Sequence, residues 1–415
     1  MLTSYLKLAW KVLLRRKFFT FASLFGVSFT LLVLTVAAAF LDHFFAPHAP
    51  ETRMDRTLGV YGLAMTGETP DGRISRTGFP GYAFLDRYVR DLPGAERVAV
   101  FQIHRPVDSY LGTQKIRSYL KRTDGAFWQI LDFEFVEGGP YTDEDDRQAR
   151  PVAVINETTR GRFFGNGPAV GKTIEVDRQR FEVVGVVRDV SYVSFVPFAD
   201  VWVPIHSARS RGFEREYVAD FMGLVLADRD QFPQLKAEFA ERLARVESPD
   251  PDFQTFRGGL ENLFEFASRV LLSPTLEKAR PGLLAAILAG AAFLFMLLPA
   301  INLVNLSLSR TMERGPEIGL RKAFGASSRT LVGQFVVESL VLSVLGGLLG
   351  LLLCALVLWG LNHSGWIPYV QLSLNYRVFL WGLVFAAAFG LLSGIYPAWR
   401  MSRLHPVVAL RGSSM

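Results

Sequence analysis

Four long apolar runs constrain the fold of this chain more than any other feature of its sequence. They cover residues 18–41, 281–309, 331–361 and 378–399, and Glu338 is the only Asp, Glu, Lys or Arg within them. Each run exceeds the roughly 20 residues that a helix needs to cross a hydrocarbon core of about 30 Å. The sequence therefore predicts an α-helical membrane protein with four transmembrane helices, in keeping with its 50% hydrophobic content.

The basic residues predict which loops face the cytoplasm. Outside residues 42–280 they gather in residues 1–17, 310–330 and 400–415, whereas the connection 362–377 has no Lys or Arg before Arg377. Because cytoplasmic loops carry an excess of Lys and Arg, both termini and the 310–330 loop are expected inside. Residues 1–17 are expected to form an interfacial helix along the inner leaflet. The first apolar run is longer than the about 7 to 15 residues of a signal-peptide core, which favours an uncleaved anchor.

Residues 42–280 have the composition of a soluble domain. Residues 82–92 and 231–246 have helical periodicity, and residues 98–103, 152–155 and 181–187 read as strands. The sequence thus predicts a large α+β extracytoplasmic domain inserted between the first and second transmembrane helices. The connection 362–377 is expected to lie on the same side of the membrane.

The loop 310–330 predicts a short amphipathic helix. Glu317 and Arg321 stand four residues apart, with the acid first, which favours a helical ion pair. Pro316 suits the first helical turn, and Gly325 suits the end of the helix. Such a helix would present a charged face to a soluble partner. The alternative is a generic basic loop that only obeys the charge rule.

The stretch from Glu313 to Ala326 resembles the cytoplasmic coupling helix of ABC transporter permeases of the MacB/FtsX superfamily. The likeness continues through Glu338 and the GGLLG that follows, and it departs from the usual pattern at Gly315 and Pro316. The resemblance implies that this segment contacts an ATPase. The implied ATPase-coupling residues are Glu313, Arg314, Glu317, Ile318, Gly319, Arg321, Lys322, Ala323, Phe324, Gly325 and Ala326.

Other segments resemble the same family. Residues 124–139, 152–165 and 171–190 are similar to the MacB-like periplasmic core domain, although Gly138-Gly139 stands where the family usually has Gly-Arg. The tail 394–412 resembles the closing signature of these permeases. Residues 206–280 match no family segment, so their role is not assigned.

Small and polar residues within the apolar runs predict helix packing. Gly346 with Gly350 and Gly390 with Gly394 have the small-xxx-small spacing that lets helices approach closely, the alternative being scattered glycines. Glu338 is expected to have a structural role near the cytoplasmic interface, paired with a basic residue of the loop. A proton relay is less favoured because no second ionisable residue lies in the runs. Cys354, the single cysteine, is interpreted as a packing residue.

Some motifs suggest chemistry that the surrounding sequence does not support. Residues 166–173, NGPAVGKT, differ from a P-loop only at the first glycine, but the residues after Lys172 read as strands, not as the helix that holds phosphates. Residues 392–394 match the start of an ABC signature by chance. The six histidines lack metal-ligand spacing. We therefore expect a noncatalytic chain with no metal site and no cofactor of its own.

The resemblance implies the permease subunit of an ABC transporter in a bacterial inner membrane. A separate ATPase subunit would bind ATP and Mg, and the permease would form a homodimer or a heterodimer with a related chain. Its coupling of ATP hydrolysis to periplasmic movement would serve efflux with a periplasmic adaptor and outer-membrane channel, lipoprotein extraction, or FtsX-like control of envelope enzymes. The alternatives are a membrane-anchored sensor or scaffold and an ion-coupled secondary transporter. Nucleic acid is not expected as a partner, since the basic residues follow the topology.

Overall fold

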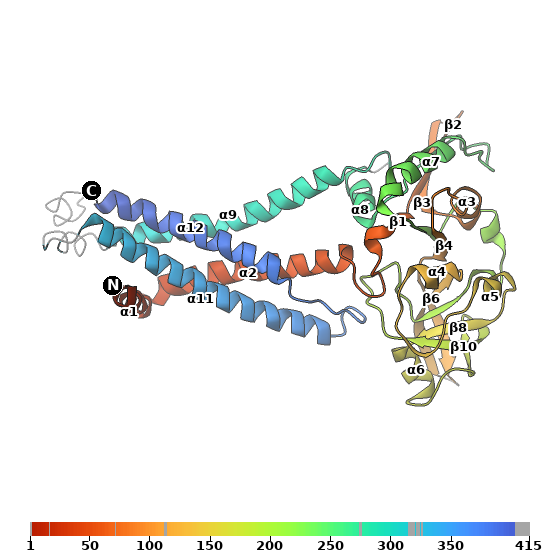
Figure 1. Ribbon diagram of the computed structural model, residues 1–415, viewed down its shortest axis with the longest axis horizontal. Coiled ribbons are helices and arrows are strands. Elements are labelled where there is room, and N and C mark those ends of the chain that lie inside the picture. The colour runs from red at the N-terminus through yellow and green to blue at the C-terminus, as the bar shows by residue number, and fades with distance from the viewer. Residues whose placement is uncertain are drawn as a thin grey trace. The chain divides into compact units, whose positions relative to one another are not determined.

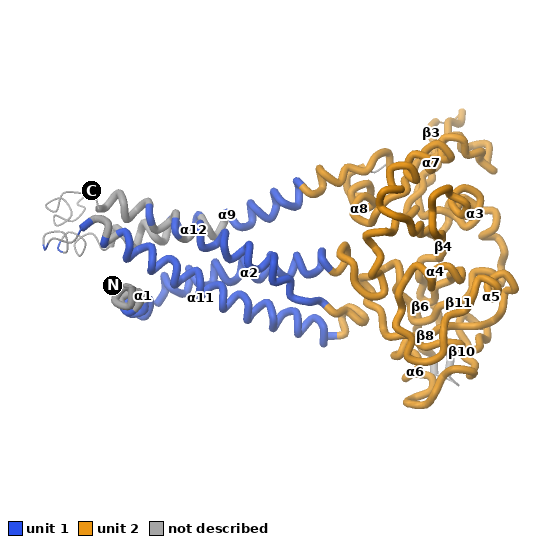
Figure 2. The backbone as a smooth tube through the Cα atoms, viewed as in Figure 1, with its two compact units in different colours: residues 1–42, 286–364, 372–415 blue, residues 43–285, 365–371 orange. Residues whose placement is uncertain are grey.

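The computed structural model describes residues 2–15, 17–70, 72–111, 114–273, 276–313, 320, 324 and 327–402. The chain divides into two compact units, coloured in Figure 2. The helical unit comprises residues 1–42, 286–364 and 372–415, and the α/β unit comprises residues 43–285 and 365–371. Residues 365–371, the middle of the connection between the third and fourth apolar runs, thus belong to the α/β unit.

The helical unit is built from the apolar runs and the segment before the first of them (Figure 1). Its helices are α1 (Leu2–Arg15), α2 (Lys17–Phe45), α9 (Pro281–Glu313), α11 (Ser328–His363) and α12 (Tyr376–Ser402). Among the described residues, two helical segments, Lys17–Phe45 and Val332–His363, are long and apolar enough to cross a membrane. Pro281–Leu297 and Tyr376–Ala388 form shorter apolar helical segments.

Glycines bring α2, α11 and α12 close together within the helical unit. A Cβ atom added to Gly346 would lie 2.8 Å from the Val27 side chain, and one added to Gly350 would lie 3.2 Å from the Leu31 side chain. Gly382 of α12 lies against the same leucine. Gly390 and Gly394 lie in α12, and the packing around them is outside the described side chains.

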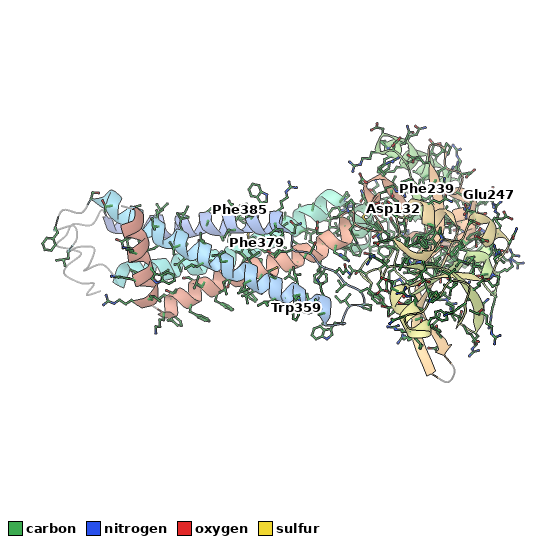
Figure 3. All side chains as sticks on the ribbon, turned by 60° about the horizontal axis from the view of Figure 1, so that its bottom comes forward. Asp132, Phe239, Glu247, Trp359, Phe379 and Phe385 are labelled. Carbon is green, nitrogen blue, oxygen red and sulfur yellow. The ribbon has the colours of Figure 1, made fainter. Side chains whose placement is uncertain are left out.

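The helical unit carries large apolar side chains on its outside. Trp359 is 63% exposed and Phe385 is 45% exposed, and both point away from the helices in Figure 3. Large exposed apolar side chains of this kind mark a surface that contacts lipid or another protein. Glu338 is buried in α11, where it accepts a hydrogen bond of 3.0 Å from the Gln334 amide.

The α/β unit contains a ten-stranded and a four-stranded sheet. In the larger sheet the strands follow the order β1-β13-β4-β6-β11-β8-β10-β9-β5, with β7 paired to β10. Strand β5 also pairs with β6, so the strands from β6 to β5 form a closed ring. The smaller sheet has the order β12-β3-β2-β14. The strands are β1 (Thr57–Val60), β2 (Leu63–Thr69), β3 (Gly72–Pro80), β4 (Arg97–Gln102), β5 (Arg105–Leu111), β6 (Gln114–Thr123), β7 (Phe135–Gly138), β8 (Val152–Asn156), β9 (Thr173–Val176), β10 (Gln179–Val187), β11 (Val201–Pro204), β12 (Val218–Ala219), β13 (Phe221–Leu226) and β14 (Thr255–Gly258).

Short helices connect and cover these strands. The α-helices are α3 (Tyr82–Tyr88), α4 (Ala126–Ile130), α5 (Asp143–Arg147), α6 (Glu157–Phe164), α7 (Phe232–Ala244) and α8 (Leu263–Leu272). Three of them, α5, α6 and α8, begin with side-chain caps: for example, the Asn156 side chain accepts from the Thr159 amide, and Asn262 forms a reciprocal capping box with Glu265. The 3-10 turns are η1 (Met54–Arg56), η2 (Ile205–Ser207), η3 (Gly212–Glu214) and η4 (Arg229–Gln231).

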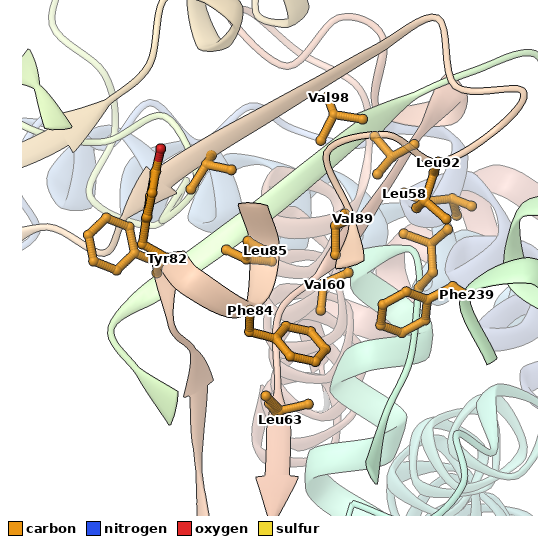
Figure 4. Close-up of a cluster of buried hydrophobic side chains, with 14 of the residues drawn as sticks. Leu58, Val60, Leu63, Tyr82, Phe84, Leu85, Val89, Leu92, Val98 and Phe239 are labelled. Carbon is orange, nitrogen blue, oxygen red and sulfur yellow. The ribbon is translucent and has the colours of Figure 1, made fainter. Parts of the chain in front are cut away.

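Apolar side chains from helices and strands form the cores of the α/β unit. In one cluster (Figure 4), Phe84 of α3 and Phe239 of α7 pack with Leu58 and Val60 of β1. A second cluster comes from the strands of the closed ring and includes Phe181 and Val203. Burial of these side chains supplies the main driving force for folding of this unit.

The sequence patterns located several of these elements. The strands predicted at 98–103, 152–155 and 181–187 are confirmed as β4, β8 and β10, and the helix predicted at 231–246 is confirmed as α7. The helix predicted at 82–92 is shorter, because α3 ends at Tyr88. Beyond Tyr88 the chain turns out of the helix: the Arg90 amide donates to the Leu85 carbonyl, five residues back, and the Leu92 amide donates to the Val89 carbonyl, three residues back.

Candidate coupling site and docked loop

The predicted ATPase-coupling segment lies mostly outside the described residues. Residues 314–319, 321–323 and 325–326 are outside them, and Glu313 is the last residue of α9. Two apolar positions of the segment are described: Leu320 is 52% exposed and Phe324 is 82% exposed. The Phe324 amide donates to the Leu320 carbonyl at 3.1 Å, a helix-type spacing. Phe324 therefore offers an apolar side chain that a partner could cover.

Residues 365–371, which we call the docked loop, are fastened to the α/β unit. The Tyr369 hydroxyl donates to Asp200 Oδ1 at 2.9 Å, and the Tyr192 amide donates to the Pro368 carbonyl at 3.0 Å. Tyr369 adopts a left-handed φ of 55°, which is uncommon for a residue with a side chain. This conformation presents the tyrosine ring to the carboxylate while the chain turns between α11 and α12.

Asp200 is the centre of the contact with the docked loop. It is 2% exposed, and it also accepts hydrogen bonds from the Asn156 amide group at 3.1 Å and the Tyr119 backbone amide at 2.9 Å. Burial raises the pKa of Asp200, while its hydrogen bonds from Tyr119, Tyr369 and Asn156 oppose the rise. Three donors therefore hold the buried carboxylate in place just before β11.

An aromatic cluster surrounds this contact. The Phe198 ring lies 6.3 Å from the Tyr369 ring, 5.0 Å from that of Tyr192 and 4.8 Å from that of His104, measured between centroids. Burial, with a smaller effect of the Lys121 charge, lowers the pKa of His104 to about 4. The imidazole is therefore neutral at physiological pH, and it serves as one more ring of the cluster.

Lys121 stabilises the segment 192–198, which contributes Tyr192 and Phe198 to this aromatic cluster. Its side chain is fully buried, and its Nζ donates to the carbonyl oxygens of Phe195, at 3.0 Å, and Val196. Burial lowers the pKa of Lys121 and raises that of Glu51 to about 8, and the two groups oppose each other's shift. A buried amine with two carbonyl acceptors fixes the backbone at 195–196, a few residues after Tyr192, whose amide binds the docked loop.

The segment that leads into α9 is fixed to α8. Arg269 forms a buried ion pair with Glu261, with Nε 2.8 Å from Oε1. Its Nη1 also donates to the carbonyls of Leu276 and Glu277 at 2.7 and 2.9 Å. One guanidinium thus links the α/β unit to the chain just before α9 begins. The hydrogen bonds of the docked loop likewise link the α/β unit to the chain between α11 and α12.

A carboxylate, an imidazole and a phenol meet near η2. Asp146 accepts from the His206 backbone amide at 2.9 Å, and its other oxygen lies 3.0 Å from His206 Nδ1. The Tyr82 hydroxyl lies 3.4 Å from His206 Nε2. The hydrogen bond to Asp146 raises the pKa of His206, and burial raises the pKa of Tyr82 to about 12. A phenol with a raised pKa is a poor nucleophile, so we interpret this group as a structural brace.

The stretch that looks like a P-loop has a different structure. Lys172 is followed by β9, which confirms the strand predicted there, and no helix begins at this point. The Lys172 Nζ lies 5.0 Å from the centre of the Phe164 ring, and its backbone amide donates to Ala169. The residues therefore form a turn before a strand, unlike the strand-to-helix loop that holds phosphates. Among the described residues, no group of three or more His, Cys, Asp or Glu is placed to hold a metal ion.

Sequence reasoning missed the docked loop. The sequence of residues 362–377 indicated only a short external connection. Two features made the contact between Tyr369 and Asp200 unpredictable. The left-handed backbone at Tyr369 has no sequence signature, and its partner Asp200 lies far away in the chain. The one available signal was the group Trp366, Ile367, Pro368 and Tyr369, which is unusually apolar for a short exposed turn.

Long apolar helices with a large α/β unit inserted between the first two are the architecture of a membrane protein with a large folded domain outside the bilayer. Residues 20–242 match the MacB-like periplasmic core domain, and residues 289–406 match the FtsX-like permease C-terminal region. The first match alone covers more than half of the 415 residues. The chain therefore belongs to the MacB/FtsX family of ABC transporter permeases, which confirms the resemblance found in the sequence.

Two proteins similar to this chain are named for export. The chain is 31% identical over 295 residues to the macrolide export ATP-binding/permease protein MacB of Bdellovibrio bacteriovorus, covering 69% of this chain and 42% of that protein. It is 25% identical over 410 residues to the pyoverdine export ATP-binding/permease protein PvdT of Pseudomonas fluorescens, covering 97% and 58%. The chain thus spans about half the length of the curated relatives it matches.

Solved structures similar to this chain include the periplasmic region of MacB from Actinobacillus actinomycetemcomitans. The sequence identity is 14% and the TM-score is 0.34, over 49% of this chain and 88% of that one.

Proposed function

We propose that this chain is the transmembrane subunit of an ABC exporter and that it transmits ATP-driven movement to its α/β unit. The observation that carries the proposal is the attachment of the α/β unit to chain segments next to the long helices. Tyr369 and Asp200 hold the docked loop between α11 and α12, and Arg269 holds the segment before α9. A shift of these helices would therefore pull directly on the α/β unit.

The motor would be a separate ATPase subunit that binds ATP and Mg. It would dock on the predicted coupling helix around Glu317 to Ala326, where the sequence combines an i,i+4 ion pair with apolar residues. In this mechanism the present chain is noncatalytic, binds no nucleotide itself and acts as a lever. The turn-to-strand structure at Lys172 supports a partner as the site of hydrolysis.

The membrane arrangement of the proposal follows from the charge distribution. Four spans would place both termini and the 310–330 loop in the cytoplasm, with the α/β unit and the docked loop in the periplasm of a bacterium. Two copies, or this chain and a related permease, would form the complete membrane part of the exporter. A periplasmic adaptor and an outer-membrane channel would complete an efflux path.

Efflux is the output we favour, because the relatives above are named for macrolide and pyoverdine export. FtsX-like control of an envelope enzyme is the second candidate. It is favoured by the match of residues 289–406, since that region is shared by permeases of this type. The two outputs use the same coupling step, so one experiment tests the step itself.

The test reverses charges in the predicted coupling helix. Glu317→Lys and Arg321→Glu should weaken assembly with the ATPase by about 2 to 5 kcal/mol, roughly thirtyfold or more, if the charges are buried at the interface. An exposed intrahelical pair would account for only about 0.3 to 0.5 kcal/mol. The readouts are co-purification of the ATPase and its stimulation by the membrane subunit. Lys7→Glu is a matched charge reversal at an exposed position of α1, outside the loop.

Topology is checked in the same preparations. Single cysteines in a Cys354→Ala background are labelled with an impermeant reagent from outside, at Ser210→Cys in the α/β unit and at Ser327→Cys in the cytoplasmic loop. Ser210 is chosen because it is exposed, whereas the nearby Ser207 is buried. Outside labelling of Ser327→Cys alone would refute the topology. Unchanged assembly and stimulation in both charge reversals would refute the coupling site.

A further inference from the structure

The α/β unit contains a pocket of about 340 Å³ next to the end of α2. Residues from three places in the chain line it: the end of α2 with the segment that follows, the η4–α7 junction, and the start of α8. The lining residues are Phe45, Pro47, Met54, Asp55, Arg229, Phe232, Asn262, Leu263 and Phe264. None of these residues takes part in the docked loop or in the Arg269 attachment.

The pocket combines an aromatic wall with one ion pair. The rings of Phe45 and Phe264 meet edge to face with centroids 5.2 Å apart, and Phe232 adds a third ring. Arg229 Nη2 lies 2.6 Å from Asp55 Oδ2, and Arg229 Nε donates to the Asp55 carbonyl at 3.0 Å. Because the two charges are already paired, the lining carries no excess charge.

The size of the pocket limits its occupant. Small-molecule sites are concave, largely apolar and about 300 to 1,000 Å³ in volume, with a few polar groups that orient the ligand. A second pocket in this unit, beside Glu51, measures about 20 Å³, which is room for about one water molecule. The larger pocket has the volume and the lining expected for a small organic molecule.

Its place in the chain suggests where such a molecule comes from. Phe45 is the last residue of α2, just beyond the apolar run that ends at Leu41, and Pro47 follows it. In the proposed topology this is where the first span leaves the outer leaflet. A molecule that concentrates at the membrane interface would meet the aromatic wall there, since amphipathic molecules place an apolar body in lipid and a polar group in water.

We propose that this pocket binds a small amphipathic molecule without net charge, with its apolar body against the three phenylalanine rings and its polar group at the Asp55–Arg229 pair. The inference rests on the proposed export function and names the substrate class for it. The same chemistry could be supplied by a free solute of the periplasm or by a membrane lipid. The proposal is the free solute, and the test separates the two sources.

The experiment uses the full chain in lipid nanodiscs and trifluoromethyl-diazirinyl benzyl alcohol, a neutral aromatic photoprobe with one hydroxyl group. After illumination, peptide mass spectrometry measures the label on residues 229–235 and 262–266. We expect saturable labelling of the wild-type chain that excess benzyl alcohol lacking the diazirine competes away. Phe264→Trp, which fills the pocket, should reduce this label about tenfold or more. Val270→Trp, at a position of the same helix that is 49% exposed and outside the pocket, should leave it unchanged.

A second arm replaces the soluble probe with phosphatidylcholine that carries the diazirine on its acyl chain. Labelling of these residues by the lipid, without competition by the benzyl alcohol, would overturn the proposal. Labelling by the soluble probe that does not saturate would also overturn the proposal. Saturation is measured on the wild-type chain, so this test does not depend on the folding of any variant. A chain that stimulates its ATPase but takes no label refutes the pocket alone. Saturable labelling without ATPase coupling supports the pocket and refutes the proposed function.

Discussion

Replacing Tyr369 by phenylalanine removes one hydroxyl group from the docked loop and leaves the ring in place. The hydroxyl donates to Asp200 at 2.9 Å, and the ring lies against Phe198. Asp200 keeps its two other donors, the Asn156 side chain and the Tyr119 amide. The substitution therefore weakens the attachment of the loop without leaving the buried carboxylate unpartnered.

The magnitude follows from the partners and the exposure. A hydrogen bond to a charged group contributes about 1.5 to 3 kcal/mol, and a neutral one about 0.5 to 1.5 kcal/mol. Tyr369 is only half-buried, so water can partly replace the lost contact. We expect Tyr369→Phe to destabilise docking by about 1 to 2 kcal/mol, which increases the undocked population by a factor of about 5 to 30.

Hydrogen exchange at the Tyr192 amide reports this population directly. That amide donates to the Pro368 carbonyl, so it is protected while the loop is docked. In Tyr369→Phe its exchange should accelerate by about 5- to 30-fold. The Asn156 amide, which donates to the Asp200 carbonyl within the α/β unit, should keep its rate. Tyr376→Phe, at a tyrosine that is 66% exposed, is the matched control.

Two results would refute this reasoning. If the Tyr192 amide exchanged at the wild-type rate in Tyr369→Phe, the hydroxyl would not hold the loop. If the Asn156 amide accelerated by the same factor, the substitution would have loosened the α/β unit as a whole. In the first case, the Tyr369–Asp200 hydrogen bond could not transmit helix movement to the α/β unit.

Three further predictions concern stability in detergent micelles. Arg269→Ala should destabilise the α/β unit by about 3 to 5 kcal/mol because it leaves the buried carboxylate of Glu261 without its cation. Arg257→Ala breaks the more exposed pair with Glu277 and should destabilise the unit by at most about 1 kcal/mol. His206→Gln should lower the unfolding temperature more at pH 5.5 than at pH 9. The first pH is about 1 unit below the ordinary pKa of histidine, and the second is well above it. The raised pKa of His206 means that its stabilisation is complete below the unfolded-state pKa and is lost as pH rises through the folded-state value. Gly346→Leu should destabilise the helical unit by about 1 to 3 kcal/mol through overpacking, and Gly360→Leu, where an added Cβ has no neighbour within 4 Å, should not.

Thermal unfolding followed by near-ultraviolet circular dichroism and by size-exclusion chromatography checks all three. Equal losses for the two arginine variants would show that burial does not govern the strength of these pairs. A larger effect of the histidine variant at high pH would reverse the assigned sign of the pKa shift. Equal tolerance of leucine at both glycine positions would refute the packing of α11 against α2.

The apolar runs and the charge pattern were enough to predict the long helices and the inserted α/β unit. Local patterns also located β4, β8 and β10 as short apolar runs and α7 by its helical periodicity, because buried positions are mostly apolar. The family followed from short motifs, and residues 20–242 and 289–406 match it. The ATPase-coupling residues stay a prediction, because most of them lie outside the part of the chain that the structure describes.

Sequence by itself determined which segments are helices, strands and apolar surfaces, since those properties depend on neighbours within a few residues. Only the tertiary structure decided that β5 pairs back with β6 to close a ring, and that Tyr369 meets Asp200. It also decided that Phe45, Phe232 and Phe264 line one pocket. These contacts join residues far apart in the chain, and they form only when burial of the cores has brought the elements together. No local pattern encodes which distant partner each residue will meet.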